Sequence, residues 1–276
     1  MFGLDNIILT ALNEDIGTGD ITSLSTIPED RMAYGRFIAK ESGVVCGTDV
    51  VERTFKLIDK ETEVVFSVND GDKIEKGDVI CEVKGKARSL LTAERVSLNF
   101  LQHLSGIATR TNTAVEQIKG YKAKIADTRK TTPGLRVLEK KAVKIGGGVN
   151  HRFNLADGVL IKDNHIVAAG GIKNAVEAAR KNAPHTLKIE VEVEDFGMLN
   201  EALEAGADII MLDNMSNEDM KKAVQIIAGR AISEASGNMG EKSLAEVAAT
   251  GVDLISIGAL THSVKALDIS LKFKML

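Results

Sequence analysis

The chain has 276 residues, of which 35 are lysine or arginine and 39 are aspartate or glutamate, giving a formal net charge of −4. Nothing in this overall charge favours a nucleic-acid partner. Hydrophobic residues make up 44% and charged residues 27%, the balance of a globular protein. No apolar run approaches the roughly 20 residues that a membrane-spanning helix needs, so we expect no membrane partner. The length allows one large domain and one smaller domain.

The amino-terminal stretch MFGLDNIILTALNEDIG carries acidic residues early and lacks the basic segment that opens a signal peptide. The two cysteines, Cys46 and Cys81, are too few for a four-cysteine metal site. They can form one disulfide or remain reduced, and we favour reduced thiols. We therefore expect a cytoplasmic protein.

The first part of the chain has the pattern of an α+β domain. Strand-like stretches at 33–47 and 63–87 are interrupted by Asn-Asp-Gly-Asp and Lys-Gly-Asp turns, which suit hairpins. A long helix is expected at about 91–117, because apolar residues recur there at helical spacing. The last segment, ALDISLKFKML, alternates like a strand or forms a terminal helix, and we expect it to return to the first domain.

The carboxy-terminal half repeats one unit, a short apolar run followed by an alanine-rich amphipathic stretch. Buried strands that alternate with helices predict a parallel sheet covered by helices, and six or seven units favour a closed α/β barrel. We place an α+β domain at 1–108, joined by 265–276, and the barrel at 109–264. The expected strands lie in the segments 122–128, 157–164, 187–194, 207–214, 230–237 and 252–259.

Polar residues and glycines stand at the carboxyl ends of these strands, where parallel barrels carry their active sites. One position per strand would surround a single opening, and successive positions are 21 to 33 residues apart. The positions are Arg129 with Lys130, Lys162, Glu192, Asp213, Ser236 with Gly237, and Gly258.

These strand ends divide by charge. From Arg129 to Lys162 there are eight basic residues and two acidic ones, a local excess of six positive charges that suits a compact polyanion. Glu192 and Asp213 can hold sugar hydroxyls or a hydrated magnesium ion. The small residues of EASGN (234–238) and SIGAL (256–260) let backbone N–H groups approach a phosphate.

Each of these signals also has a structural interpretation. For Lys140, Lys141 and Lys144 we favour a solvated helix face. Asp213 can be a helix cap, and His151 and His165 can be ordinary hydrogen-bonding histidines. The residues Glu190, Glu192 and Glu194 share one strand face, and their spacing does not show which of them has a special role.

Several short segments of the sequence resemble those of the quinolinate phosphoribosyltransferase family. They occur in the same order, from about residue 14 to the end. Of these, TRKTTPGLR followed by NHR and KDNH is highly specific. The departures are mild: Lys141 stands where an aromatic or small residue is expected, and Met239 where isoleucine is more usual. The matching segments are GDIT (19–22), ERVSLNFLQHLSGIAT (94–109), DTRKTTPGLR (127–136), GGGVNHR (146–152), LIKDNH (160–165), VEVE (191–194), LDN (212–214), EASGN (234–238) and ISIGALTHS (255–263).

The resemblance implies an amino-terminal open-faced sandwich, an incomplete barrel of about seven strands, and a homodimer or higher oligomer in which Arg95 reaches the partner's site. It implies that quinolinate and pyrophosphate are held by Arg129, Lys130, His151, Arg152 and Lys162, with Thr128 contributing through its backbone. Glu192 and Asp213 would contact ribose and Mg²⁺, the metal directly or through water. The 5′-phosphate would be held by Ser236, Gly237, Asn238 and Gly258. The catalytic set would be Lys130, Lys162, Glu192 and Asp213.

The implied reaction transfers the phosphoribosyl group of phosphoribosyl pyrophosphate to quinolinate with decarboxylation, giving nicotinate mononucleotide. Three alternatives remain open. Nicotinate phosphoribosyltransferase needs fewer cations, because its substrate has one carboxylate, and the molybdenum-associated paralogue shares much of the framework. The hairpin NDGDKIEKGDVICEVKG also resembles a lipoyl or biotinyl carrier, although Lys86, in GKARSLL, lacks the usual carrier context.

Overall fold

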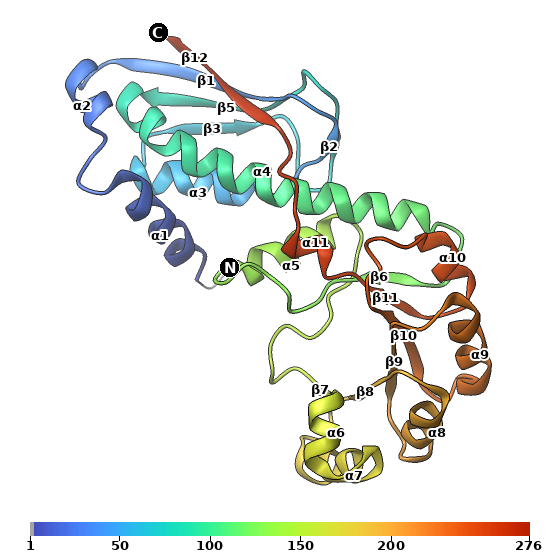
Figure 1. Ribbon diagram of the computed structural model, residues 1–276. Helices are drawn as coiled ribbons and strands as arrows, with labels where there is room; N and C mark the ends of the chain where they lie inside the picture. Colours follow the sequence, from blue (N-terminus) through green and yellow to red (C-terminus); the bar gives the residue numbers. More distant parts are fainter. Residues whose placement is uncertain (1–2) are drawn as a thin grey trace. The chain divides into compact units, whose positions relative to one another are not determined.

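The computed structural model describes residues 3–276, which form two compact units (Figure 1). The first unit contains the described residues up to Asn112, then Thr132–Gly147 and Ser263–Leu276. The second unit contains Thr113–Thr131 and Gly148–His262. The segment 132–147, which the sequence pattern groups with the barrel, therefore lies in the first unit.

The first unit combines helices with an antiparallel sheet of strand order β12-β1-β5-β3, and a small second sheet pairs β2 with β4. The carboxy-terminal segment is a strand, since β12 pairs along the whole of β1 from Ala33 to Ala39. The helices are α1 (Leu4–Ile16), α2 (Ile21–Thr26), α3 (Thr48–Ile58), most of α4 (Ala87–Gln117) and α5 (Arg136–Ile145). The strands are β1 (Met32–Ala39), β2 (Gly43–Val44), β3 (Glu63–Phe66), β4 (Lys73–Ile74), β5 (Val79–Lys86) and β12 (Ile269–Met275).

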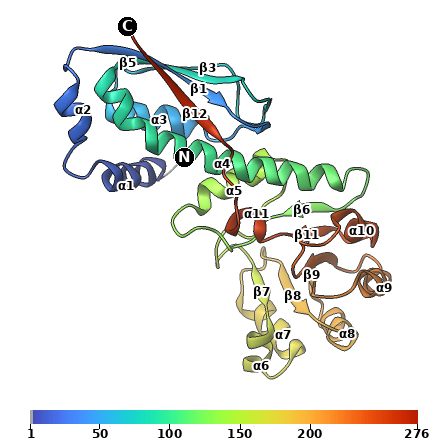
Figure 2. The ribbon, with the colours of Figure 1, turned by 45° about the horizontal axis from the view of Figure 1, so that its top comes forward.

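The core of this unit lies between one face of the larger sheet and the helices α3 and α4 (Figures 1 and 2). Alternate residues of β1 are buried, including Ala33, Phe37 and Ala39, because successive strand side chains point to opposite faces. Phe37 meets Phe55 of α3 edge to face, with ring centroids 6.0 Å apart. This arrangement confirms the predicted α+β domain.

Lys86 ends β5, opposite Met32 in the ladder with β1. A carrier lysine has to stand at an exposed turn, so the position of Lys86 argues against a carrier module. The cysteines Cys46 and Cys81 are both free and buried, and burial raises the pKa of each thiol.

The helix α5 corrects one expectation from the sequence. Lys140 is 1% exposed, and Lys141 forms ion pairs with Asp49 at 2.7 Å and Asp70 at 2.9 Å. Only Lys144 is exposed as a solvated helix face requires. The interpretation was wrong for Lys140 and Lys141, because the acids that oppose Lys141 lie about 70 to 90 residues away in sequence.

Asp70 connects this ion-pair network to the start of α3. One of its oxygens accepts the N–H groups of Gly47 at 2.8 Å and Thr48 at 3.0 Å. Burial alone raises the pKa of Asp70, but the hydrogen bonds from Thr48 and the ammonium of Lys141 together outweigh burial and lower it. Asp70 therefore stabilises the fold as an anion.

We expect Asp70→Ala to lower the free energy of unfolding by about 3 kcal/mol at pH 7, because two N–H groups and Lys141 lose a charged acceptor. Asp70→Asn, which keeps an oxygen acceptor, should lose about half as much. A carboxylate whose pKa is lowered on folding contributes stability above its unfolded pKa of about 3.9, and this stability disappears as the pH falls through the folded pKa. Urea denaturation from pH 7 to pH 3 should therefore show the wild type converging on Asp70→Asn, and a constant gap would contradict the assignment.

The second unit is built on a parallel sheet of strand order β6-β11-β10-β9-β8-β7. In addition, Val149 forms an isolated parallel bridge with Ala126, outside the six strands of the sheet. Within residues 3–276 no ladder joins β6 to β7, so the barrel is incomplete, as the family resemblance implies, and is not the closed barrel that the strand pattern favours. The strands are β6 (Lys124–Ala126), β7 (Val159–Ile161), β8 (Ile189–Val193), β9 (Ile209–Asp213), β10 (Ile232–Ser236) and β11 (Leu254–Ser256).

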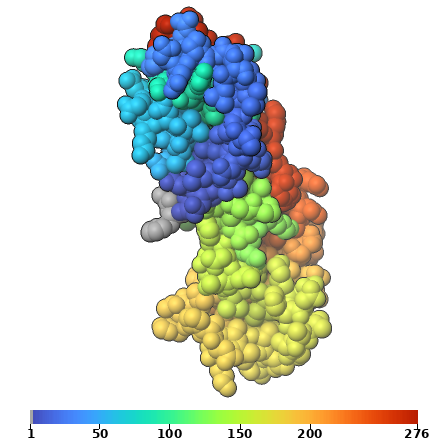
Figure 3. Space-filling view, turned by 90° about the vertical axis from the view of Figure 1, so that its left-hand side faces the viewer, coloured from blue at the N-terminus to red at the C-terminus, as the bar shows by residue number. Residues whose placement is uncertain are grey.

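Helices follow the strands of this sheet, and α8, α9 and α10 lie along its outer side in both views (Figures 1 and 2). α6 buries no residue, and together with α7 it forms part of the surface coloured yellow in Figure 3. The helices are α6 (Asp163–Ala169), α7 (Ile172–Asn182), α8 (Phe196–Glu204), α9 (Asn217–Ile227), α10 (Leu244–Ala249) and α11 (Ala259–His262). Among all described helices, none is long and apolar enough to cross a membrane.

Candidate active site

A pocket of about 300 Å³ lies in the second unit, at the carboxyl ends of the sheet strands. The sequence places seven of the lining residues in the site, and their convergence is what the strand-end rule for parallel barrels requires. These seven are Thr128, Arg129, Lys130, His151, Arg152, Lys162 and Ser236. The remaining lining residues are Leu160, Met211, Glu234 and Ser256.

The loop that carries His151 and Arg152 is fixed by Asp127, directly after β6. The carboxylate of Asp127 is completely buried and accepts the His151 N–H at 2.8 Å and the Asn150 side-chain amide at 2.6 Å. The Arg152 guanidinium donates to the carbonyl of Gly158 at 3.1 Å. Asp127 is a positioning residue that sequence reasoning missed, although it directly precedes the Thr128–Lys130 segment.

The positively charged groups of the pocket are destabilised by burial and by one another. Burial lowers the pKa of Arg152, the charge of Arg129 lowers it further, and Glu190 opposes both effects. Two guanidinium groups that destabilise each other's charge are stabilised when an anion binds between them. The arrangement therefore suits an anionic ligand.

Lys162 and Glu192 form an ion pair across neighbouring strands, from the end of β7 to β8. Glu192, Met211 and Glu234 are paired in register across β8, β9 and β10, so their side chains point to the same face of the sheet. The Lys162 backbone N–H donates to Nδ1 of His165 at 3.1 Å. His165 is therefore a local hydrogen-bonding histidine.

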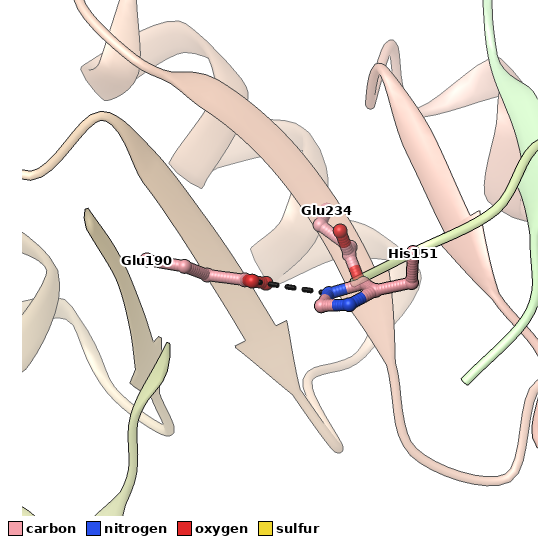
Figure 4. Close-up of side chains that lie close together, drawn as sticks. All are labelled: His151, Glu190 and Glu234. Atoms are coloured by element: carbon pink, nitrogen blue, oxygen red, sulfur yellow. Dashed lines mark ion pairs between the residues drawn. The ribbon is translucent and has the colours of Figure 1, made fainter. Parts of the chain in front are cut away.

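Nε2 of His151 faces two buried acids, Glu190 of β8 and Glu234 of β10, whose carboxylates turn towards the ring (Figure 4). Its Nε2 is 3.0 Å from Glu190 Oε2 and 3.6 Å from Glu234 Oε1. Burial and the neighbouring Glu190 raise the pKa of Glu234 to about 7, against the opposing effects of the Ser256 hydroxyl and Lys162. Of the three glutamates on one face of the 187–194 segment, Glu190 is buried, Glu192 is paired and Glu194 is exposed.

The strand-end residues of β9 and β10 contact each other closely. Gly237 has φ +92°, and a Cβ built there would lie 2.2 Å from Oδ1 of Asn214. The Asn214 N–H donates to the Ser236 carbonyl at 3.1 Å, and its side-chain amide donates to Asp213 at 2.7 Å. The helix α9 is capped by Ser216, so Asp213 is not its cap.

Gly258 lies against the side chain of Lys130. A Cβ at Gly258 would be 3.0 Å from Lys130 Cδ and 3.2 Å from the ring of His262. The Thr261 hydroxyl donates to the Lys130 carbonyl at 2.8 Å. The turn after β11 therefore holds Lys130 from two sides.

Some predicted residues do not line the pocket itself. Glu192, Asp213, Gly237, Asn238 and Gly258 lie at or next to strand ends in the same unit. Arg95 is exposed on α4, in the first unit. The sequence did not single out Glu234 or Ser256, and the available signal for Glu234 was an acid within an otherwise small and apolar strand.

Comparison with known proteins assigns the family. The profile of the quinolinate phosphoribosyl transferase carboxy-terminal domain matches residues 107–272, and the profile of its amino-terminal domain matches residues 20–105. The chain belongs to the quinolinate phosphoribosyltransferase family. The resemblance seen in the sequence is therefore confirmed.

Individual members of the quinolinate phosphoribosyltransferase family are similar over nearly the whole chain. A probable nicotinate-nucleotide pyrophosphorylase [carboxylating] of Bacillus subtilis is 48% identical, covering 94% of this chain and 89% of the relative. A quinolinate phosphoribosyltransferase [decarboxylating] of Nicotiana tabacum, named 1b, is 45% identical, covering 98% and 82%. The solved nicotinate-nucleotide pyrophosphorylase of Francisella tularensis superimposes with a TM-score of 0.94 at 45% identity, covering 98% of this chain and 96% of that one.

Proposed function

We propose that this chain transfers the phosphoribosyl group of phosphoribosyl pyrophosphate to quinolinate. The pyridine nitrogen forms a bond to the sugar carbon as pyrophosphate leaves, and the adjacent carboxylate then leaves as carbon dioxide while a proton replaces it. The products are nicotinate mononucleotide, pyrophosphate and carbon dioxide. The observation that carries the proposal is the group of four cations at one pocket, Arg129, Lys130, Arg152 and Lys162, in a member of this family.

Each part of the opening has a role in this reaction. The guanidinium groups of Arg129 and Arg152 suit the two carboxylates of a diacid, since each can donate two parallel hydrogen bonds. Lys130 and Lys162 are point charges that suit the pyrophosphate. Ser236, Gly237, Asn238 and Gly258 bring small side chains and backbone groups to the 5′-phosphate, and Thr128 contributes through its backbone. His151 lines the same pocket.

Glu192 and Asp213 fit a magnesium ion by the chemistry of their donor set. Both offer carboxylate oxygens at the ends of neighbouring strands, and Mg²⁺ prefers oxygen ligands and retains several waters. When bound, Mg²⁺ would neutralise charge on the pyrophosphate. The same carboxylates accept hydrogen bonds from ribose hydroxyls and favour the positive charge that develops on the sugar.

We also propose a homodimer in which Arg95 reaches the opening of the partner subunit. Support comes from family membership and from the position of Arg95 on α4. Its long cationic side chain is exposed there, so it is accessible to a partner subunit. With Arg95 the site would have a fifth cation for a substrate pair rich in negative charge.

The direct test is incubation of the purified protein with quinolinate, phosphoribosyl pyrophosphate and Mg²⁺, with nicotinate mononucleotide measured by chromatography and mass spectrometry. We expect turnover of quinolinate and at least 100-fold lower kcat/KM for nicotinate, because nicotinate lacks the second carboxylate that the cations bind. Preferred turnover of nicotinate would identify a nicotinate phosphoribosyltransferase. No turnover of either acid would favour the molybdenum-associated paralogue.

A further inference from the structure

Both ring nitrogens of His151 are engaged by the protein. Nδ1 accepts the backbone N–H of Arg152 at 2.8 Å, and Nε2 lies 3.0 Å from a carboxylate oxygen of Glu190. The backbone N–H of His151 itself donates to Asp127 at 2.8 Å. The ring therefore connects the buried acid Glu190 to the backbone N–H of Arg152.

The direction of these hydrogen bonds fixes the form of the ring. An amide N–H can only donate, so Nδ1 of His151 carries a lone pair, and the ring proton lies on Nε2. Nε2 then donates to Glu190. The ring is held as the neutral Nε2–H tautomer, and its nitrogens face protein groups.

The position of the ring proton decides whether the cluster of His151, Glu190 and Glu234 suits a metal ion or a hydrogen bond. Ligand atoms of His151, Glu190 and Glu234 lie within 4.8 Å of one another, close enough for a metal ion. A histidine that binds a metal through one nitrogen donates its other N–H to an acceptor. Here the other nitrogen accepts a hydrogen bond, so the arrangement suits a proton between Nε2 and Glu190 and does not suit a metal.

The two acids are costly to bury, which indicates a purpose for them. Glu190 is 4% exposed and Glu234 is 1% exposed, and the Glu190 Oε1 atom has no hydrogen-bond partner within residues 3–276. Burying a charged or unsatisfied carboxyl costs several kcal/mol unless the surroundings compensate. The nearby groups that compensate are the His151 ring, the Ser256 hydroxyl, which donates to Glu234, and the ammonium of Lys162.

We propose that Glu190 is a positioning residue that holds the His151 ring, and that His151 in turn fixes the backbone of Arg152 so that its guanidinium meets a substrate carboxylate. The inference deepens the proposed function and rests on it. His151 thus acts through Arg152, and its ring nitrogens make no direct bond to the pyridine diacid. The position of the Arg152 guanidinium matters because a small displacement of a substrate-binding group lowers the reaction rate by a large factor.

A double-mutant cycle tests this order of action. We expect His151→Ala and Glu190→Ala each to raise the KM for quinolinate at least tenfold while changing the KM for phosphoribosyl pyrophosphate less than twofold. In an Arg152→Ala background, each should cost less than a further twofold, because the guanidinium that they position is gone. An undiminished loss in that background would show that His151 binds the substrate itself, and would overturn the proposal.

Conservative variants provide a second readout. The side-chain oxygen of asparagine can accept the Arg152 N–H in place of Nδ1, so His151→Asn should recover most of the loss seen with His151→Ala. Likewise Glu190→Gln keeps an oxygen that accepts the Nε2 proton, and it should be much milder than Glu190→Ala. Equal losses for the matched pairs would contradict positioning through hydrogen bonds.

A measurement without substrate separates this proposal from the proposed reaction. Nitrogen NMR of the ligand-free protein labelled at histidine should show His151 protonated at Nε2 and not at Nδ1, with an unchanged signal on addition of Zn²⁺. A proton on Nδ1, or a shift with Zn²⁺, would refute the positioning assignment whatever substrate the enzyme uses. If the tautomer is as expected but quinolinate is not turned over, the proposed function fails alone.

Discussion

The Arg152→Ala variant is expected to lose about 100-fold or more in kcat/KM for quinolinate, which corresponds to about 2.7 kcal/mol of transition-state stabilisation. Arg152 lines the pocket, and burial together with Arg129 lowers its pKa. A bound carboxylate relieves this mutual destabilisation, so its affinity depends on both guanidinium groups. The KM for quinolinate should rise in steady-state assays at saturating phosphoribosyl pyrophosphate.

Arg180→Ala is a matched control for this experiment. Arg180 is an arginine of the same unit whose side chain is 47% exposed and pairs with Asp208 at 3.0 Å, and it does not line the pocket. Exposed ion pairs contribute less than about 1 kcal/mol to stability, so this variant should fold and keep wild-type kinetics. Unchanged kinetics in Arg152→Ala would remove Arg152 from the site.

The barrel could be predicted from the sequence because its strands are short apolar runs that end in polar residues. The run at 207–214, for example, becomes β9 (Ile209–Asp213), and Asp213 stands at its carboxyl end as predicted. The parallel bridge at Val149 could not be predicted, because a single bridged residue beside β6 leaves no apolar run to detect. The division of the chain could not be predicted either, since the amphipathic pattern of 136–145 does not show to which unit that helix belongs.

Within the site, the sequence located the cations and Glu192, but not which acid contacts which cation. A basic residue at a strand end has one obvious use, so Arg129, Lys130 and Lys162 stood out. Alternation along β8 places Glu190 and Glu192 on the same face, but a period of two cannot show that one contacts His151 and the other Lys162. Such partners depend on neighbouring strands, and they are visible only in three dimensions.

The Gly237→Ala variant is expected to lose at least 100-fold in kcat/KM for phosphoribosyl pyrophosphate. With φ at +92°, an alanine Cβ would lie 2.2 Å from the Asn214 side-chain oxygen and 2.7 Å from the Asn214 backbone nitrogen. Backbone cannot move aside as a flexible side chain can, so Asn214 must shift and carry Asp213 with it. The proposed phosphate and ribose contacts would then be displaced together. Steady-state assays with phosphoribosyl pyrophosphate varied would measure this loss.

Gly229→Ala separates this clash from backbone strain alone. Gly229 also has a positive φ, +76°, but a Cβ there meets nothing within 4 Å. An alanine in the left-handed region costs about 1–2 kcal/mol at either position. Both variants should therefore lose similar backbone stability, and only Gly237→Ala should lose activity. Quinolinate is proposed to bind the guanidinium groups of Arg129 and Arg152. Its affinity, measured without the sugar substrate, should therefore be unchanged in Gly237→Ala. Wild-type kinetics in Gly237→Ala would place the phosphate away from the end of β10.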